Sequence, residues 1–289
     1  MNNDYRTKII NTIFKISNNS NAFEQIEAAH SKISLEKLLD EIVQIGIMPE
    51  VFEHDSSEEK LWSKLSDVIL ATSLNYLGLK SEVIRTRGNS ADVYSKIDGY
   101  TLVSDAKCFR LSRTAKNQKD FKIKALDDWR REDTYALLVA PLYQYPIDRS
   151  QIYPQAITKN VTLLSYTHLR FLLGKTQKAS LLPLWKAGKR LSKKFTTTEK
   201  QRGISYWKEI DRIVCNICGS TLDKLKQCKL EEIEKTKELG QEGIVYWQNK
   251  INEFNRLSKN EAIRMLIKTQ KIEQKIQTIE KAISRNYII

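Results

Sequence analysis

The chain has 289 residues, and its 48 Lys and Arg against 35 Asp and Glu give a formal net charge of +13 and an isoelectric point near 9.4. Such a charge indicates a polyanionic partner, while no apolar run approaches the roughly eighteen residues that span a bilayer. Four cysteines are too few for a disulfide scaffold, so the composition argues against a membrane protein and a disulfide-rich secreted domain, and we expect a cytoplasmic location.

The first part of the chain predicts helices. Apolar residues recur at helical spacing over 4–46, with a break at 18–21 and an end at Gly46 and Pro49. Ser56 and Glu59 then fit an S-x-x-E capping box, and the apolar stripe that follows predicts a helix ending near Gly78. Two roles stay open for Glu59: reaching back to the cap, or aiming its carboxylate at a metal site. We expect a helical N-terminal region over residues 1–55.

A β-hairpin is predicted around Asp98 and Gly99, because β-branched and aromatic residues flank a dipeptide that favours a two-residue type I′ loop. If Ile97 faces Tyr100 across that loop, Asp92 lies opposite Asp105 with β-carbons about 5 Å apart. Side chains alternate along a strand, so Lys107 shares the face of Asp105. The register therefore brings two carboxylates and one ammonium together.

Two carboxylates about 5 Å apart repel each other by roughly 3 kcal/mol at an effective dielectric near 20. A divalent cation would reverse the sign of this interaction, and oxygen ligands suit Mg²⁺, with Mn²⁺ as a substitute. Lys107 could then orient, or help to deprotonate, a water beside a phosphate. The alternative is a solvated hairpin face on which a lysine offsets an aspartate, since short D-x-K matches are common.

Residues 108–131 form a basic stretch directly after Lys107, with eight basic and three acidic residues. A charge run is usually a solvated face, but its place next to the three charged residues favours DNA binding. Candidate phosphate ligands, which fix position without reading sequence, are Arg110, Arg113, Lys116 and Lys119. Candidates for contacts with base edges are Asn117, Asp120 and Lys122.

The middle of the chain predicts an α/β core. A helical pattern over 121–129 is followed by short apolar runs at 135–140 and 161–165, which suit parallel strands covered by helices on both sides. With the antiparallel hairpin these strands form a mixed sheet, and we assign the core to residues 56–175. Residues 176–289 predict a helical C-terminal region. Its isoleucines at 272, 276, 279 and 283 could pack within the chain or between two copies.

Several segments closely match a known family. They are Ser-Asp-Ala-Lys at 104–107, the run from Phe to Lys at 109–122, Arg-Gly-Asn-Ser-Ala-Asp-Val at 87–93, Gln-Tyr-Pro at 144–146 and Glu-Lys-Leu at 59–61. In these segments the chain resembles the HindIII family of type II restriction endonucleases, which belongs to the PD-(D/E)xK nuclease superfamily. The resemblance thins toward both ends of the chain.

The resemblance implies a PD-(D/E)xK nuclease core and a homodimer that cuts palindromic double-stranded DNA in a Mg²⁺-dependent reaction. It points to AAGCTT, cut between the two adenines to leave 5′ overhangs and 5′-phosphates. It also implies a bacterial cytoplasm in which a cognate methyltransferase protects the host DNA. Two other functions stay open from the residues alone: a repair or junction-resolving nuclease on the same core, and a non-enzymatic basic DNA-binding protein.

The resemblance also assigns roles to residues. Asp92 and Asp105 correspond to the metal-binding carboxylates, the Ala106 carbonyl to a further metal ligand, and Lys107 to the catalytic lysine. Residues 117, 120 and 122 match a segment tied to DNA recognition. The chain departs from the superfamily motif where Ala91, rather than proline, precedes Asp92.

Overall fold

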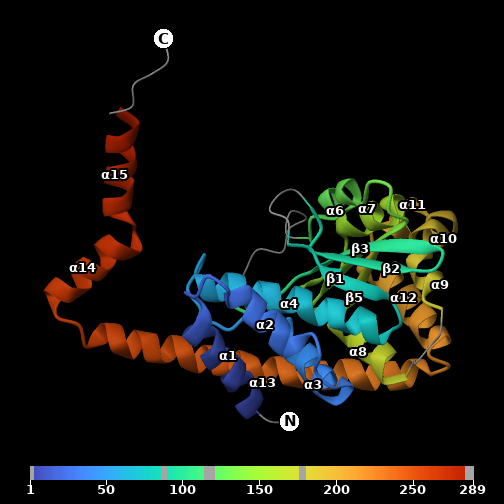
Figure 1. Ribbon diagram of the computed structural model, residues 1–289, viewed down its shortest axis with the longest axis horizontal. Helices are drawn as coiled ribbons and strands as arrows, with labels where there is room; N and C mark the ends of the chain where they lie inside the picture. The colour runs from blue at the N-terminus through green and yellow to red at the C-terminus, as the bar shows by residue number, and fades with distance from the viewer. Residues whose placement is uncertain (1–2, 86–89, 114–120, 176–179, 284–289) are drawn as a thin grey trace. The chain divides into compact units, whose positions relative to one another are not determined.

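The computed structural model describes residues 3–85, 90–113, 121–175 and 180–283 (Figure 1). The chain divides into two compact units, Met1–Gly240 and Gln241–Ile289. The first unit holds the sheet and most of the helices. Its boundary differs from the division at 55 and 175 proposed from the sequence, which stays a prediction.

A five-stranded mixed sheet lies at the centre of the first unit, with its strands in chain order: β1 (Lys80–Val83), β2 (Val93–Ile97), β3 (Tyr100–Ala106), β4 (Tyr135–Ala140) and β5 (Val161–Ser165). Strands β1, β2 and β3 pair antiparallel, and β3, β4 and β5 pair parallel. The predicted α/β class and mixed sheet are therefore confirmed. Strand β1, whose four residues include two charged ones, was not predicted from the sequence.

The hairpin between β2 and β3 has the predicted register but not the predicted turn. Ile97 pairs with Tyr100 and Val93 with Ser104. Gly99 has a φ of +91°, whereas Asp98 is not among the residues with positive φ, so a type I′ turn, which needs positive φ at both positions, was wrong. A left-handed conformation is unfavourable for a residue with a β-carbon, and the glycine alone adopts it.

Helices cover the sheet as its apolar composition requires. All residues of β4 and β5 are buried, as expected for strands covered on both faces. Among the described residues, helices that contact the sheet are α4 (Ser57–Tyr76) on β1, β2 and β3, α6 (Ile123–Arg130) on β3, β4 and β5, α9 (Leu182–Trp185) on β4 and β5, and α7 (Ile152–Lys159), α8 (Tyr166–Lys175) and α10 (Ala187–Lys194) on β5. The β3-α6-β4 crossover confirms the predicted parallel pair.

The N-terminal helices pack on this core. The predicted helical stretch forms α1 (Asn3–Ile16), α2 (Ala22–His30) and α3 (Leu35–Ile45), with a second break at 31–34 that the sequence did not indicate. Trp62 on α4 donates a hydrogen bond of 3.0 Å from Nε1 to the carbonyl of Ile45. Arg6 donates to the carbonyls of Gln44 and Ile47 at 2.9 and 2.8 Å. These bonds tie α1 and α3 to the helix beside the sheet.

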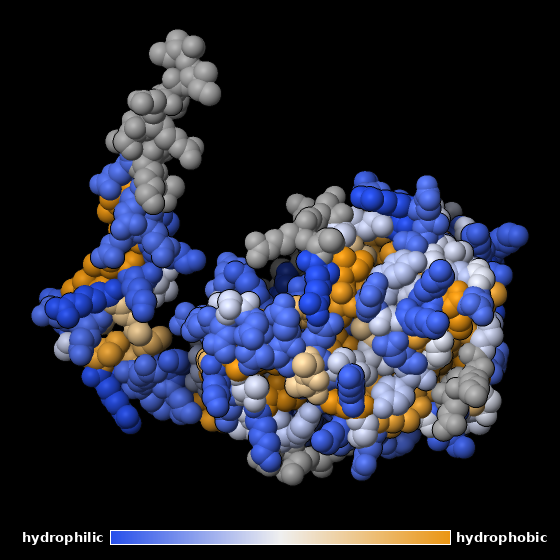
Figure 2. All heavy atoms as spheres, viewed as in Figure 1, coloured by the Kyte–Doolittle hydropathy of each residue, from blue (hydrophilic) through white to orange (hydrophobic). Residues whose placement is uncertain are grey.

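The C-terminal region is helical, as predicted. Its described helices are α9 (Leu182–Trp185), α10 (Ala187–Lys194), α11 (Thr197–Lys200), α12 (Gly203–Ile217), α13 (Leu222–Asn255), α14 (Lys259–Thr269) and α15 (Ile272–Ile283). A short 3-10 helix, η1 (Leu142–Gln144), lies within the core just after β4. A capping box formed by Ser258 and Glu261 begins α14. Within the second unit, hydrophobic residues lie exposed among hydrophilic ones, among them Ile263 and Leu266 on α14, and both kinds are visible on the face drawn in Figure 2. Among the described residues, no helix combines the length and the apolar character needed to cross a bilayer.

Candidate active site

The β2-β3 hairpin and α4 bring three aspartates together. Because Val93 faces Ser104, the next pair outward is Asp92 and Asp105, as the sequence predicted. Asp67, near the middle of α4, joins them. The three side chains each offer a carboxylate oxygen, and these oxygens lie within 4.8 Å of one another. The site therefore joins the end of a hairpin to the helix that packs on it.

Asp67 was not identified from the sequence. It is 4% exposed, and Asp105 is fully buried. Residues 65–74 of α4 are otherwise apolar or small and uncharged, and all of them are buried. A charged side chain is rarely buried unless it is paired or holds a cation. The one carboxylate in this run was the signal that could have found the residue.

Two lysines stand against the three aspartates. Lys107 Nζ donates to Asp105 Oδ1 at 2.6 Å and lies 2.5 Å from Oδ2. The second contact lacks hydrogen-bond geometry, so Oδ2 has no hydrogen-bond donor among the described groups. Lys64, also on α4, donates to Asp92 Oδ1 at 2.9 Å and Asp67 Oδ2 at 3.3 Å. The Lys64 ammonium thus bridges two carboxylates where a cation is electrostatically favoured.

The protonation of the site reflects this crowding. Burial raises the pKa of Asp105 to about 6; the charge of Lys107 opposes the rise and that of Asp92 adds to it. Burial, followed by the charge of Asp92, raises the pKa of Asp67 well above its usual range. Burial would raise the pKa of Asp92 too, but its hydrogen bond from Lys64 holds that pKa below its usual value. A cation bound among the three would favour their ionised forms.

Lys107 is held in its charged form. Burial acts to lower its pKa, but the charge of Asp105 and the hydrogen bond to it raise the pKa above the usual value for lysine. Its side chain is 18% exposed. Ala106, between Asp105 and Lys107, is the last residue of β3. Its carbonyl as a metal ligand stays a prediction.

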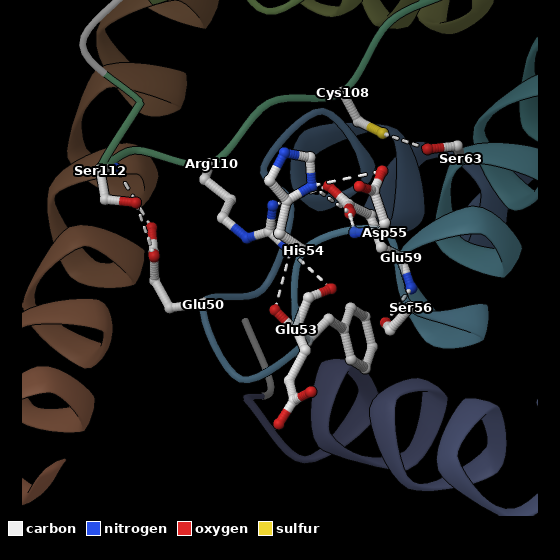
Figure 3. A network of polar contacts seen from close by, with 11 residues as sticks. Glu50, Glu53, His54, Asp55, Ser56, Glu59, Ser63, Cys108, Arg110 and Ser112 are labelled. Carbon is white, nitrogen blue, oxygen red and sulfur yellow. Dashed lines mark hydrogen bonds and ion pairs between the residues drawn. The ribbon is translucent and has the colours of Figure 1, made fainter. Parts of the chain in front are cut away.

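Glu59 lies in a different group. Its Oε2 accepts a hydrogen bond of 2.6 Å from the amide of Asp55, and its Oε1 accepts one of 2.7 Å from Arg110 (Figure 3). Ser56 caps α4 by accepting from the amide of Glu59 at 3.1 Å. The helix cap predicted from the sequence is present at Ser56. The Glu59 carboxylate, however, binds the amide of Asp55, the residue before Ser56. The structure does not bring Glu59 among the three aspartates.

The basic stretch is described only in part. Arg110 is bound to Glu59, and the guanidinium of Arg113 lies over the Phe109 ring at 5.1 Å. Lys122 is exposed and has a φ of +47° just before α6. The remaining candidates lie outside the described residues: Lys116, Asn117, Lys119 and Asp120.

Comparison with known proteins agrees with this geometry. Residues 7–283 match the model of the HindIII restriction endonuclease family. The chain belongs to the HindIII restriction endonuclease family. It is 38% identical over 255 residues to the type II restriction enzyme HindIII of Haemophilus influenzae. The aligned region covers 86% of this chain and 84% of that protein.

Membership of the HindIII family confirms the resemblance drawn from the segments around Asp105 and the basic stretch. It also confirms the prediction of a site-specific deoxyribonuclease over a non-enzymatic DNA-binding protein or a junction-resolving nuclease. The mixed sheet, with a D-x-K sequence at the end of β3, is consistent with the PD-(D/E)xK type. The three aspartates supply the hard oxygen ligands that a divalent metal ion prefers, so the donor set fits a metal-dependent nuclease.

Proposed function

We propose that the protein hydrolyses phosphodiester bonds of double-stranded DNA at the palindrome AAGCTT in a reaction that requires Mg²⁺, with Mn²⁺ as a substitute. The proposed cut lies between the two adenines and leaves 5′ overhangs with 5′-phosphates. The observation that carries the proposal is the convergence of Asp67, Asp92 and Asp105 beside Lys107. The proposed DNA sequence, AAGCTT, rests on the similarity of the basic stretch to the HindIII family.

Asp92, Asp105 and the carbonyl of Ala106 would hold the metal ion, with Asp67 as an additional carboxylate. The oxygens of the three aspartates lie within 4.8 Å of one another, and the Lys64 ammonium already bridges Asp92 and Asp67. When bound, the metal would neutralise charge that develops on the scissile phosphate.

Lys107 acts as a charged group in this proposal. Because Asp105 keeps its ammonium protonated, Lys107 orients the attacking water and stabilises the negative charge of the phosphate. Water attacks the phosphorus in line with the 3′ oxygen, which leaves as that bond breaks. No covalent enzyme intermediate is needed.

Two copies of the chain would act together. A palindrome presents the same sequence on both strands, and a homodimer with twofold symmetry places one active site on each. We place the enzyme in the bacterial cytoplasm, where methylation of the same palindrome by a cognate methyltransferase would protect the host DNA.

Digestion of a plasmid of known sequence, with Mg²⁺ and with EDTA, tests the proposal. We expect discrete fragments with Mg²⁺ and intact plasmid with EDTA, and sequencing of the fragment ends should give A followed by AGCTT. Cleavage in EDTA would contradict the metal requirement. Ends at another fixed sequence would contradict AAGCTT alone, and ends scattered at random would contradict site-specific cleavage.

A further inference from the structure

The first residues of the basic stretch are bound to the loop between α3 and α4 and to the start of α4. The amide of Phe109 donates to the carbonyl of Gly46 at 3.0 Å, and the carbonyl of Phe109 accepts from the amide of Met48 at 3.0 Å. Tyr143 donates its hydroxyl to the same Phe109 carbonyl at 2.8 Å. The backbone beyond the catalytic strand is thus held from two sides.

Arg110 is turned toward the protein (Figure 3). Its Nη1 donates to Glu59 Oε1 at 2.7 Å, and its Nη2 donates to the carbonyls of Phe52 at 2.7 Å and Glu53 at 3.4 Å. The Arg110 and Glu59 side chains are only 17% and 20% exposed. A guanidinium that spans a carboxylate and a carbonyl uses its planar fork for internal contacts. To bind a phosphate, Arg110 would have to give up these contacts.

A second carboxylate holds the same segment two residues further on. Glu50 accepts hydrogen bonds from Ser112 through both oxygens, at 3.1 Å from the amide and 2.7 Å from the hydroxyl (Figure 3). Glu50 and Glu59 are acidic residues beside a basic stretch, where each would repel DNA if left uncompensated. Their contacts with Ser112 and Arg110 give both carboxylates a structural use.

The other end of the basic stretch rests on the same unit. Phe121 is fully buried, stacks on Tyr145 with ring centroids 5.1 Å apart, and lies 6.1 Å from the Phe109 ring. The contacts at Phe109 and Phe121 therefore hold the described residues on either side of 114–120.

We propose that Glu59 and Arg110 form a positioning pair that sets sequence discrimination, supported by Glu50 and Ser112, and that Arg110 is not a phosphate ligand. Glu59 lies two helical turns before Asp67 on α4, and Arg110 follows Asp105 by five residues. The pair thus joins the two elements that supply carboxylates to the active site. Through this pair, DNA contacts made by the basic stretch are coupled to β3. This inference rests on the proposed cleavage of one fixed sequence.

The first test compares four variants: Glu59→Gln, Arg110→Ala, their double variant, and Glu231→Gln as a control. Glu231 forms a similar ion pair with Arg170 at 3.0 Å on other helices. The measured quantity is kcat/KM on the cleaved site divided by kcat/KM on the same site with one base pair changed. We expect this ratio to fall about tenfold in each single variant and no further in the double variant, since one mismatch is ordinarily worth a factor of this size. The control should keep the wild-type ratio.

The same assay separates positioning from chemistry. Because the three aspartates and Lys107 are untouched, kcat on the cleaved site should stay within about threefold of wild type in the Glu59 and Arg110 variants. A ratio that stays at the wild-type value in both, or a kcat that falls about a hundredfold with the ratio unchanged, would overturn the inference.

A second test addresses Arg110 as a phosphate ligand. A residue that binds a phosphate lowers the slope of log K against log salt by about one when it is removed. Arg110→Ala should keep the wild-type slope on DNA that lacks the site, whereas Arg113→Ala should lower it. A loss of about one in the Arg110→Ala slope would refute our reading of this residue.

Two milder variants test whether a loss of folding, rather than of positioning, explains a lower discrimination ratio. Ser112→Ala removes only the hydroxyl contact with Glu50, and Arg110→Lys keeps the charge but cannot span Glu59 and Phe52 together. Both should melt like the wild type and still lower the discrimination ratio, and an unchanged ratio in both would contradict the inference. If the wild type cuts no fixed sequence, the proposed function fails; if it does and the variants discriminate normally, only this inference fails.

Discussion

At the scale of single residues, Asp67 is the carboxylate whose role can be tested most cleanly. Asp67→Asn keeps the shape of the side chain and removes its charge. We expect cleavage to fall by about a hundredfold or more, as for loss of a group that holds a catalytic metal ion, while DNA binding without metal is retained. Cleavage of a labelled duplex and gel retardation measure the two effects. Asp98→Asn, on the hairpin turn, should cut normally; full activity in Asp67→Asn would show that this carboxylate is dispensable.

Glu232 provides a prediction about pH that is independent of the metal site. Burial raises its pKa to about 7, against a weaker opposing hydrogen bond from the amide of Leu142. Between about pH 4.5 and 7 the folded state therefore holds a proton that the unfolded state has lost. The free energy of unfolding falls as the pH rises through this interval. Glu232→Gln should match the wild type below about pH 4 and exceed its unfolding free energy by up to about 3 kcal/mol above pH 7. Urea unfolding of both proteins from pH 4 to 8 measures the difference, and a difference that does not change with pH would contradict this assignment.

At the scale of elements, the β2-β3 hairpin holds the active-site register through its turn. Gly99 has a φ of +91°, and no atom lies within 4 Å of the point that an added β-carbon would occupy. Gly99→Ala should therefore destabilise the protein by about 1–2 kcal/mol through backbone conformation alone. Gly174 is a helical glycine with the same open surroundings, so Gly174→Ala should instead stabilise it by about 0.5 kcal/mol. Thermal unfolding of both variants gives the comparison, and equal effects would refute the explanation.

The elements also show what the sequence could predict. The pairing of Asp92 with Asp105 followed from strict alternation around one dipeptide, because register is a local property of a hairpin. The approach of Asp67 to that pair did not, because it depends on how α4 packs on the sheet. Strand β1 was missed since its Lys-Ser-Glu-Val sequence shows little apolar alternation. The contact between Arg110 and Glu59 joins residues 51 positions apart, and sequence spacing gives no signal for such a contact.

At the scale of the whole molecule, the net charge of +13 predicts DNA binding that weakens steeply with salt. Phosphate contacts release counterions, so log K should fall linearly with log salt, with a slope on the order of −5. Arg113→Ala and Lys122→Ala should each make the slope shallower by about one. Lys237, an exposed lysine paired with Glu234 on α13, serves as the control and should leave the slope unchanged. A slope near zero for the wild type would argue against the basic stretch as the DNA surface.

We expect one metal ion to be shared by carboxylates from the hairpin and α4. Calorimetric titration with Mn²⁺ measures metal binding in the wild type and in three variants: Asp67→Asn, Asp92→Asn and Asp105→Asn. We predict that each substitution weakens Mn²⁺ binding by about tenfold or more, and that Asp55→Asn, in the separate group with His54 and Glu59, leaves it unchanged. Wild-type affinity in all three variants, or a loss confined to Asp55→Asn, would contradict the account.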